Sequence, residues 1–193
     1  MYWGSKKMKE LKNFIIYFVF VCINCNAVAQ TDKGIEYYSK KDFTNAIACF
    51  LQAAEQGDSA AQVRLANCYY NGEGVNKNYP EAVKWYKKAA EQGDVYAQYK
   101  FGRCYDFGEG VIKDQTEAVN WYKKAAEQGL ADAQYNLGVC YDNGEGVTTN
   151  HEEAVKWYRK AAGQGLADAQ YNLGVCYYNG EGVETDYEEA VRW

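Results

Sequence analysis

The stretch YNLGVCYDNGEGV, residues 135–147, returns at residues 171–183 as YNLGVCYYNGEGV, with a single residue changed. Looser versions of this stretch begin at Val63 and at Tyr99. The four starting positions are each 36 residues apart, and the spacing does not slip. A fixed period of this length is the signature of a repeat array, in which each unit stacks on the next.

The composition favours helices over strands or disorder. The 193 residues include only 1 Pro, so long helical patterns can run without interruption. The formal net charge is −5. An acidic chain without a basic stripe cannot gain the counterion-release energy that dominates nucleic-acid binding, so we expect no nucleic-acid partner.

The first 29 residues have the pattern of a cleavable secretory signal. Lysines precede an apolar run at residues 14–23, and the small-residue pattern AVA follows at residues 27–29. The apolar run is shorter than the roughly 20 residues that span a bilayer, so an uncleaved anchor fits less well. We therefore expect residues 1–29 to be removed from a secreted or periplasmic protein that does not contact the membrane. The mature chain would carry 17 basic and 25 acidic side chains, a net charge of 17 − 25 = −8. A start at Met8 would give a more typical signal length.

Cleavage would also remove Cys22 and Cys25, whose C-x-x-C spacing otherwise suggests redox or metal chemistry. The residues that flank these two cysteines fit a lipidation signal poorly. Five cysteines remain. The first unit contains Cys49, and the later units contain a ladder of cysteines spaced 36 residues apart, namely Cys68, Cys104, Cys140 and Cys176. Equivalent positions on stacked helices lie roughly 8–10 Å apart, beyond the limit of roughly 7 Å between the Cα atoms of a disulfide. We interpret these cysteines as small buried core residues that form no zinc site.

Each 36-residue unit reads as two helices. In the first helix, one face carries the apolar residues at i, i+4, i+7 and i+8, namely Ala133, Leu137, Cys140 and Tyr141. Gly138 lies beside this face, where the missing side chain would let a partner helix approach closely. The residues Asn143 and Gly144 predict the end of this helix.

The second helix has an equally clear start. In each unit a polar residue suited to cap the helix stands three positions before a Glu, at Asn78, Asp114, Asn150 and Asp186. An apolar stripe follows, exemplified by Ala154, Val155, Trp157, Tyr158, Ala161 and Ala162. The chain is then expected to reverse at Gly57, Gly93, Gly129 and Gly165. One such helix pair cannot bury both of its faces alone, so neighbouring pairs must stack.

These residues resemble the Sel-one-like repeat (SLR), a relative of the tetratricopeptide repeat with a longer loop between its helices. The matching unit reads A-x-x-x-L-G-x-x-Y-x-x-G-x-G-V, followed by A-x-x-W-Y-x-x-A-A-x-x-G. The resemblance implies an all-α fold, a right-handed α-solenoid of stacked antiparallel helix pairs. The predicted repeats are an N-terminal tetratricopeptide-like capping pair without the G-x-G-V loop at 30–57, and Sel-one-like repeats over 58–193, at 58–93, 94–129, 130–165 and 166–193. The last repeat stops at Trp193 within its second helix, so we expect a truncated sequence.

Residues suited to catalysis are scarce. After the predicted signal the chain has one His, His151, and two Ser, Ser39 and Ser59. We interpret His151 as an exposed loop or helix-start residue, and the loop at 142–146 lacks the alternating oxygen ligands of an EF-hand. We therefore predict no enzyme activity, no cofactor and no metal. The resemblance keeps one alternative open, a cell-wall or penicillin-interacting hydrolase-like member of the cysteine-rich group, although the paired cysteines of that group are absent.

The resemblance also implies a curved array in which the first helix of each repeat lines the concave face. It further implies an adaptor protein that assembles protein complexes. We predict a monomeric scaffold or adaptor of the cell envelope or secreted fraction that binds a peptide or protein segment. A structural envelope role and glycan binding stay open. The residues predicted to face the partner are first-helix positions outside the core, namely Tyr99, Arg103, Asp106, Tyr135, Asp142, Asn143, Tyr171 and Tyr178. Aromatic rungs offer contact area at low entropy cost, but the alternative is that each Tyr packs on the next repeat.

Overall fold

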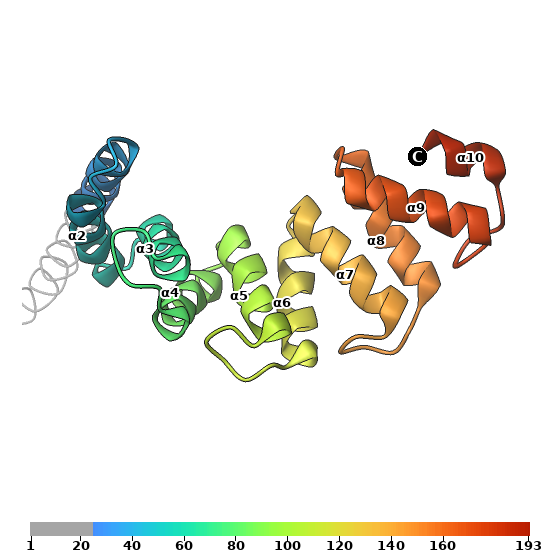
Figure 1. Ribbon diagram of the computed structural model, residues 1–193, viewed down its shortest axis with the longest axis horizontal. Helices are drawn as coiled ribbons and strands as arrows, with labels where there is room; N and C mark the ends of the chain where they lie inside the picture. The colour runs from blue at the N-terminus through green and yellow to red at the C-terminus, as the bar shows by residue number, and fades with distance from the viewer. Residues whose placement is uncertain (1–24) are drawn as a thin grey trace, which may run out of the picture. The chain divides into compact units, whose positions relative to one another are not determined.

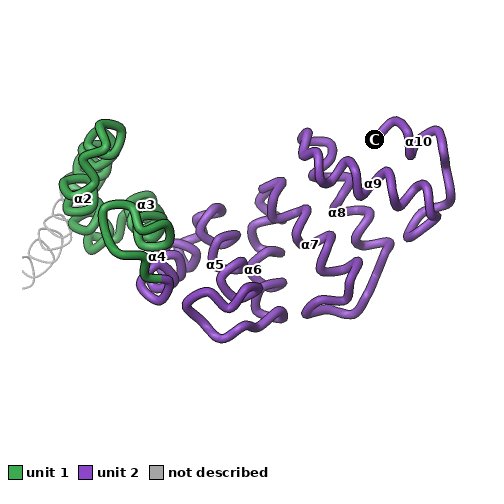
Figure 2. Tube along the Cα trace, viewed as in Figure 1, with its two compact units in different colours: residues 1–78 green, residues 79–193 purple. Residues whose placement is uncertain are grey.

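Helices alternate with short turns and loops along residues 25–193, which are the residues that the computed structural model describes (Figure 1). No strand occurs in that range, which confirms the predicted all-α fold. Most of the predicted signal, residues 1–24, lies outside it. The chain divides into two compact units between Asn78 and Tyr79 (Figure 2). None of the helices in the described range is both long and apolar enough to cross a membrane.

The first unit contains helical residues 25–39, α2 (Phe43–Glu55) and α3 (Ser59–Asn71). The last residues of the predicted signal belong to its first helix. Ala27 is buried, and its carbonyl oxygen accepts a hydrogen bond of 3.1 Å from the hydroxyl of Thr31, which is also buried. The helix therefore runs without a break across the predicted cleavage position.

The turn between the first two helices of this unit is short. It spans residues 40–42, and Lys41 adopts a left-handed conformation with a φ of 61°. In the later repeats the corresponding connection is longer, as at residues 108–114. Gly34 lies directly against α2, since a Cβ atom at this position would lie 2.5 Å from the ring of Phe50. The short turn thus keeps the close contact between the two helices of a pair.

The second unit is a series of helices, each of which packs against the next one in the sequence (Figure 1). Six of them have 13 residues, and the last has 6: α4 (Tyr79–Glu91), α5 (Val95–Phe107), α6 (Gln115–Glu127), α7 (Ala131–Asn143), α8 (His151–Gly163), α9 (Ala167–Asn179) and α10 (Tyr187–Arg192). The predicted stacking of helix pairs is confirmed.

Local sequence sets the ends of these helices. The side chains of three predicted N-caps accept hydrogen bonds from backbone amides of the first turn, at Asp114, Asn150 and Asp186. The predicted stop of α7 is also confirmed, because Gly144 caps the helix with a φ of 73°. Gly146 follows in the same loop and lies against the backbone of Gln115, which begins α6. A side chain at Gly146 would collide with that backbone, so the second loop glycine allows the loop to pack on the preceding helix.

The core repeats as the sequence predicted. Ala133, Leu137 and Cys140 of α7 are buried and pack with residues of α6, while Tyr141 is half-buried beside them. Gly138 faces Tyr158 of α8, and a Cβ atom at Gly138 would lie 2.7 Å from the ring. The absence of a side chain at this position is therefore what allows α7 and α8 to approach each other.

A buried glutamine in α3, α5 and α7 was not predicted from the sequence, namely Gln62, Gln98 and Gln134. Gln134 is 5% exposed, and its amide nitrogen donates to the carbonyl oxygen of Ala126 at 3.1 Å. Its amide oxygen accepts a hydrogen bond of 2.8 Å from Gln164, which follows α8. Gln98 and Gln128 form the same pair, also at 2.8 Å. Because every buried polar group needs a partner, these glutamines connect consecutive repeats in one register.

Candidate functional site

An open cavity of about 460 Å³ lies between α5 and α7. We call it the α5–α7 cavity. Four of the eight residues predicted to face a partner line it, namely Tyr99, Arg103, Asp106 and Tyr135. The first three fall at i, i+4 and i+7 along α5, so they share one helix face. The opposite wall is formed by Tyr135, Asn136 and Val139 of α7.

The two tyrosines in this cavity are each half-buried against the second helix of their own repeat. The ring centroid of Tyr99 lies 6.0 Å from that of Tyr122, and Tyr135 lies 6.0 Å from Tyr158. The rings of the two pairs are tilted by 37° and 38°. Burial raises the pKa of both Tyr99 and Tyr135. The alternative drawn from the sequence is packing of each Tyr on the next repeat, whereas these ring contacts lie within one repeat. Both tyrosines also line the cavity.

The predicted aspartates hold second-helix tyrosines in place. The hydroxyl of Tyr122 donates to Asp106 at 3.0 Å, and that of Tyr158 donates to Asp142 at 3.3 Å. Burial, helped by the nearby carboxylate, raises the pKa of both of these tyrosines. The Nδ1 atom of His151 lies 2.7 Å from the other oxygen of Asp142. These contacts give both carboxylates a positioning role in the wall of the array.

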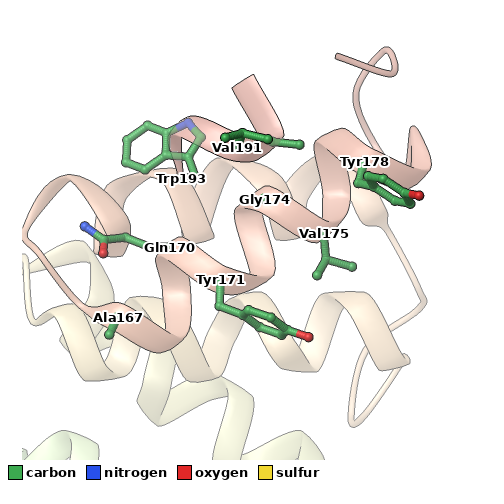
Figure 3. A pocket seen from close by; sticks show the side chains of 9 residues that line it. Ala167, Gln170, Tyr171, Gly174, Val175, Tyr178, Val191 and Trp193 are labelled. Carbon is green, nitrogen blue, oxygen red and sulfur yellow. The ribbon is translucent and has the colours of Figure 1, made fainter. Parts of the chain in front are cut away.

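Two other predicted residues, Tyr171 and Tyr178, line a separate cavity of about 360 Å³ between α9 and α10 (Figure 3). Tyr171 is 71% exposed, and Val191 and Trp193 of the C-terminal segment lie on the far side of the cavity (Figure 3). Asn143 is exposed at the end of α7 and donates to Glu145 at 3.3 Å. The eight predicted residues thus do not form one continuous surface.

Sequence reasoning missed Phe107, which also lines the α5–α7 cavity. The prediction followed side chains that recur in register, and Phe107 departs from that pattern, since the equivalent residues are Asn71, Asn143 and Asn179. The guanidinium carbon of Arg103 lies 5.3 Å from the centroid of the Phe107 ring, a cation–π distance. A departure from the repeat was therefore the signal that could have found this residue.

The cysteine ladder lies in the core. Cys68, Cys104, Cys140 and Cys176 are all buried, and burial raises the pKa of Cys104 and Cys140 to about 12. A thiol with so high a pKa stays protonated near neutral pH and is a poor nucleophile. Within residues 25–193 no group of three or more His, Cys, Asp or Glu side chains is placed to hold a metal ion.

Solved structures give close matches to this architecture. The chain is 39% identical to a Sel1 repeat protein from Oxalobacter formigenes, with a TM-score of 0.84, over 87% of this chain and 71% of that one. It is 36% identical to a protective antigen of uropathogenic Escherichia coli that displays an SLR fold, with a TM-score of 0.83, over 85% of this chain. It spans only 36% of the length of that antigen. Helicobacter pylori cysteine rich protein B is 28% identical, with a TM-score of 0.53, over 67% of this chain and 93% of that one.

Comparison with curated proteins gives no match. The family model of the Sel1 repeat matches five consecutive segments, at residues 29–58, 59–94, 95–130, 131–166 and 167–193. The matched segments follow one another without a gap and hold all the helices from α2 to α10. The chain therefore belongs to the Sel1 repeat family.

Proposed function

We propose that this protein is a scaffold that binds a peptide or protein segment in the α5–α7 cavity. Sel1 repeat proteins generally mediate protein–protein interactions and are generally non-catalytic. The observation that carries the proposal is the meeting of Tyr99 and Arg103 from one helix with Tyr135 and Val139 from another around one open cavity.

The geometry suits a peptide better than a reaction. The rings of Tyr99 and Tyr135 are held by the tyrosines of α6 and α8, so they offer apolar area that needs little further ordering. Asn136 and Glu145 provide a donor and an acceptor for a peptide backbone. The volume lies within the roughly 300–1,000 Å³ of typical ligand sites, enough for one or two side chains of a bound segment.

A bulky charge in the cavity tests this proposal. Val139 is half-buried and lines the α5–α7 cavity, whereas the equivalent Val175 lines the cavity between α9 and α10. The full chain, Val139→Arg and Val175→Arg are each used to capture proteins from an envelope extract. We expect a captured polypeptide to be lost at least tenfold with Val139→Arg and retained with Val175→Arg. Retention by Val139→Arg, or loss only with Val175→Arg, would place binding elsewhere.

The envelope setting is itself part of the proposal, and it rests on the lysines, the apolar run and the AVA pattern of residues 1–29. We expect mature protein to begin at Gln30. Intact-mass measurement and N-terminal sequencing of protein from expressing cells check this expectation. An N-terminus at Met1 or Met8 would contradict export by a cleaved signal.

A further inference from the structure

The repeat formed by α5 and α6 differs from its neighbours at the rim of the α5–α7 cavity. Phe107 is 61% exposed and Ile112 is 90% exposed. The other repeats carry polar residues at both positions, namely Asn71, Asn143 and Asn179 for the first, and Asn76, Thr148 and Glu184 for the second. The fold therefore does not need large apolar side chains there. Two of them exposed on one short segment are a feature of interaction sites.

Positive charge accompanies these apolar side chains. Arg103 stands where other repeats have Asn67, Val139 and Val175, and its guanidinium carbon lies 5.3 Å from the Phe107 ring centroid. Lys113 directly follows Ile112 and lines the α5–α7 cavity. A guanidinium over an aromatic ring donates hydrogen bonds from its edges, so it can bind a carboxylate while it covers the ring.

Two carboxylates also line the α5–α7 cavity, Asp106 on α5 and Glu145 after α7. Asp106 accepts the hydrogen bond from the hydroxyl of Tyr122. Glu145 belongs to the loop after α7 and accepts from Asn143. On the α5 side a bound segment therefore meets Arg103 and Lys113 beside Phe107, with the Asp106 carboxylate already accepting from Tyr122. On the α7 side it meets the Glu145 carboxylate and no Lys or Arg among the lining residues. This difference favours an acidic residue of the partner beside Arg103 and Lys113.

We propose that Arg103, Phe107, Ile112 and Lys113 form a rim that selects peptide segments in which a large apolar side chain adjoins an Asp or Glu. The apolar side chain packs on Phe107 and Ile112, and the carboxylate pairs with Arg103 and Lys113. The selection rests on the proposed function, because it names the class of segment that the α5–α7 cavity takes.

Random eight-residue peptides displayed on phage provide the probe. They are selected on the immobilised full chain, and the affinity of single synthetic peptides is then measured by fluorescence anisotropy. We expect the selected peptides to pair a Phe, Leu, Ile or Trp with a neighbouring Asp or Glu. Replacing that acid by its amide should weaken binding about tenfold, and the affinity should fall as salt is raised.

The rim is tested with substitutions to residues that other repeats have at the same positions, because those residues are compatible with the fold. Phe107→Asn with Ile112→Thr should weaken binding at least tenfold, and Lys113→Thr should weaken it about threefold to tenfold. The matched control is Asn179→Ala with Glu184→Ala, at the positions of the last repeat equivalent to Phe107 and Ile112, which should leave the affinity within twofold. Far-UV circular dichroism verifies that each variant keeps its helices.

The outcomes separate this inference from the proposed function. Two results would overturn the selective rim and leave the cavity as the binding site. Selected peptides that bind the full chain but not Val139→Arg would contain no apolar–acidic pair, or they would bind the Phe107 and Ile112 variant with unchanged affinity. If no selected peptide loses binding with Val139→Arg, the proposed function fails and the rim with it.

Discussion

Helices α7 and α9 begin with the same eleven residues, ADAQYNLGVCY, yet their side chains have different surroundings. Tyr135 of α7 is half-buried against Tyr158, whereas Tyr171 of α9 is 71% exposed. Both helices bury the equivalent leucine completely. In the described chain, α7 is followed by the full-length α8 and then by α9, whereas α9 is followed only by the six-residue α10. The leucine is thus buried even beside the short α10, whereas burial of the tyrosine depends on a full-length second helix.

The largest effect that this comparison predicts is at the glycine that follows the buried leucine, Gly138 in α7 and Gly174 in α9. A Cβ atom at Gly138 would lie 2.7 Å from the ring of Tyr158, whereas one at Gly174 would meet the Ala190 carbonyl oxygen at 3.0 Å and no aromatic ring within 3.8 Å. Overpacking costs about 1–3 kcal/mol and the gain in helix propensity is about 1 kcal/mol. We expect Gly138→Ala to lower the free energy of unfolding by up to about 2 kcal/mol and Gly174→Ala to change it by less than about 1 kcal/mol. Denaturant unfolding measures both, and equal losses would contradict the role of the following helix.

The next largest effect concerns the tyrosines. Tyr135→Ala removes a ring that packs on Tyr158 and should destabilise the chain by about 1–2 kcal/mol. Tyr171→Ala removes a mostly exposed ring and should cost less than about 0.5 kcal/mol. Thermal unfolding of the two single variants checks the difference. If Tyr171→Ala proves as costly as Tyr135→Ala, then the last repeat is packed more tightly than its exposure indicates.

The equivalent cysteines of α7 and α9, Cys140 and Cys176, allow the same comparison by thiol reactivity. Burial raises the pKa of Cys140 to about 12 and that of Cys176 to about 11, from an ordinary value of 9.0. The larger thiolate fraction of Cys176 predicts that iodoacetamide labels Cys176 faster than Cys140 at pH 9, which mass spectrometry of the native protein can follow.

The same raised pKa values predict alkaline unfolding. Because the folded state favours the neutral thiol, its contribution to stability is complete below about pH 9 and is lost as the pH rises through about 11 and 12. Cys140→Ala should weaken this pH dependence of the unfolding midpoint, after allowance for the lost packing. An unchanged pH profile would mean that the buried tyrosines dominate the alkaline transition instead.

Sequence reasoning recovered the parts of the molecule that repeat. The helix pairs, the inward set of Ala133, Leu137 and Cys140, and the need for Gly138 all follow from periodicity, because every unit solves the same packing problem. It missed Gln134, since a single polar residue gives no periodic apolar signal and its partner lies 30 residues away. It missed Phe107 because a ladder of equivalent residues hides the one that differs. The separation of Tyr171 from the α5–α7 cavity depends on where each helix meets its neighbour, which spacing alone does not give.

The smallest effect that we predict concerns the glutamine link between repeats. Gln134 and Gln164 share a hydrogen bond of 2.8 Å, while the equivalent Gln170 donates to Ala162 at 3.3 Å, and the six-residue α10 that follows in the described chain contains no glutamine. A double-mutant cycle with Gln134→Ala and Gln164→Ala should give a coupling energy of about 1 kcal/mol, the net value of a buried hydrogen bond. Gln170→Ala should cost roughly half as much as Gln134→Ala, because it breaks no link to a later repeat. A coupling energy near zero, measured by denaturant unfolding, would show that apolar packing alone sets the register of these repeats.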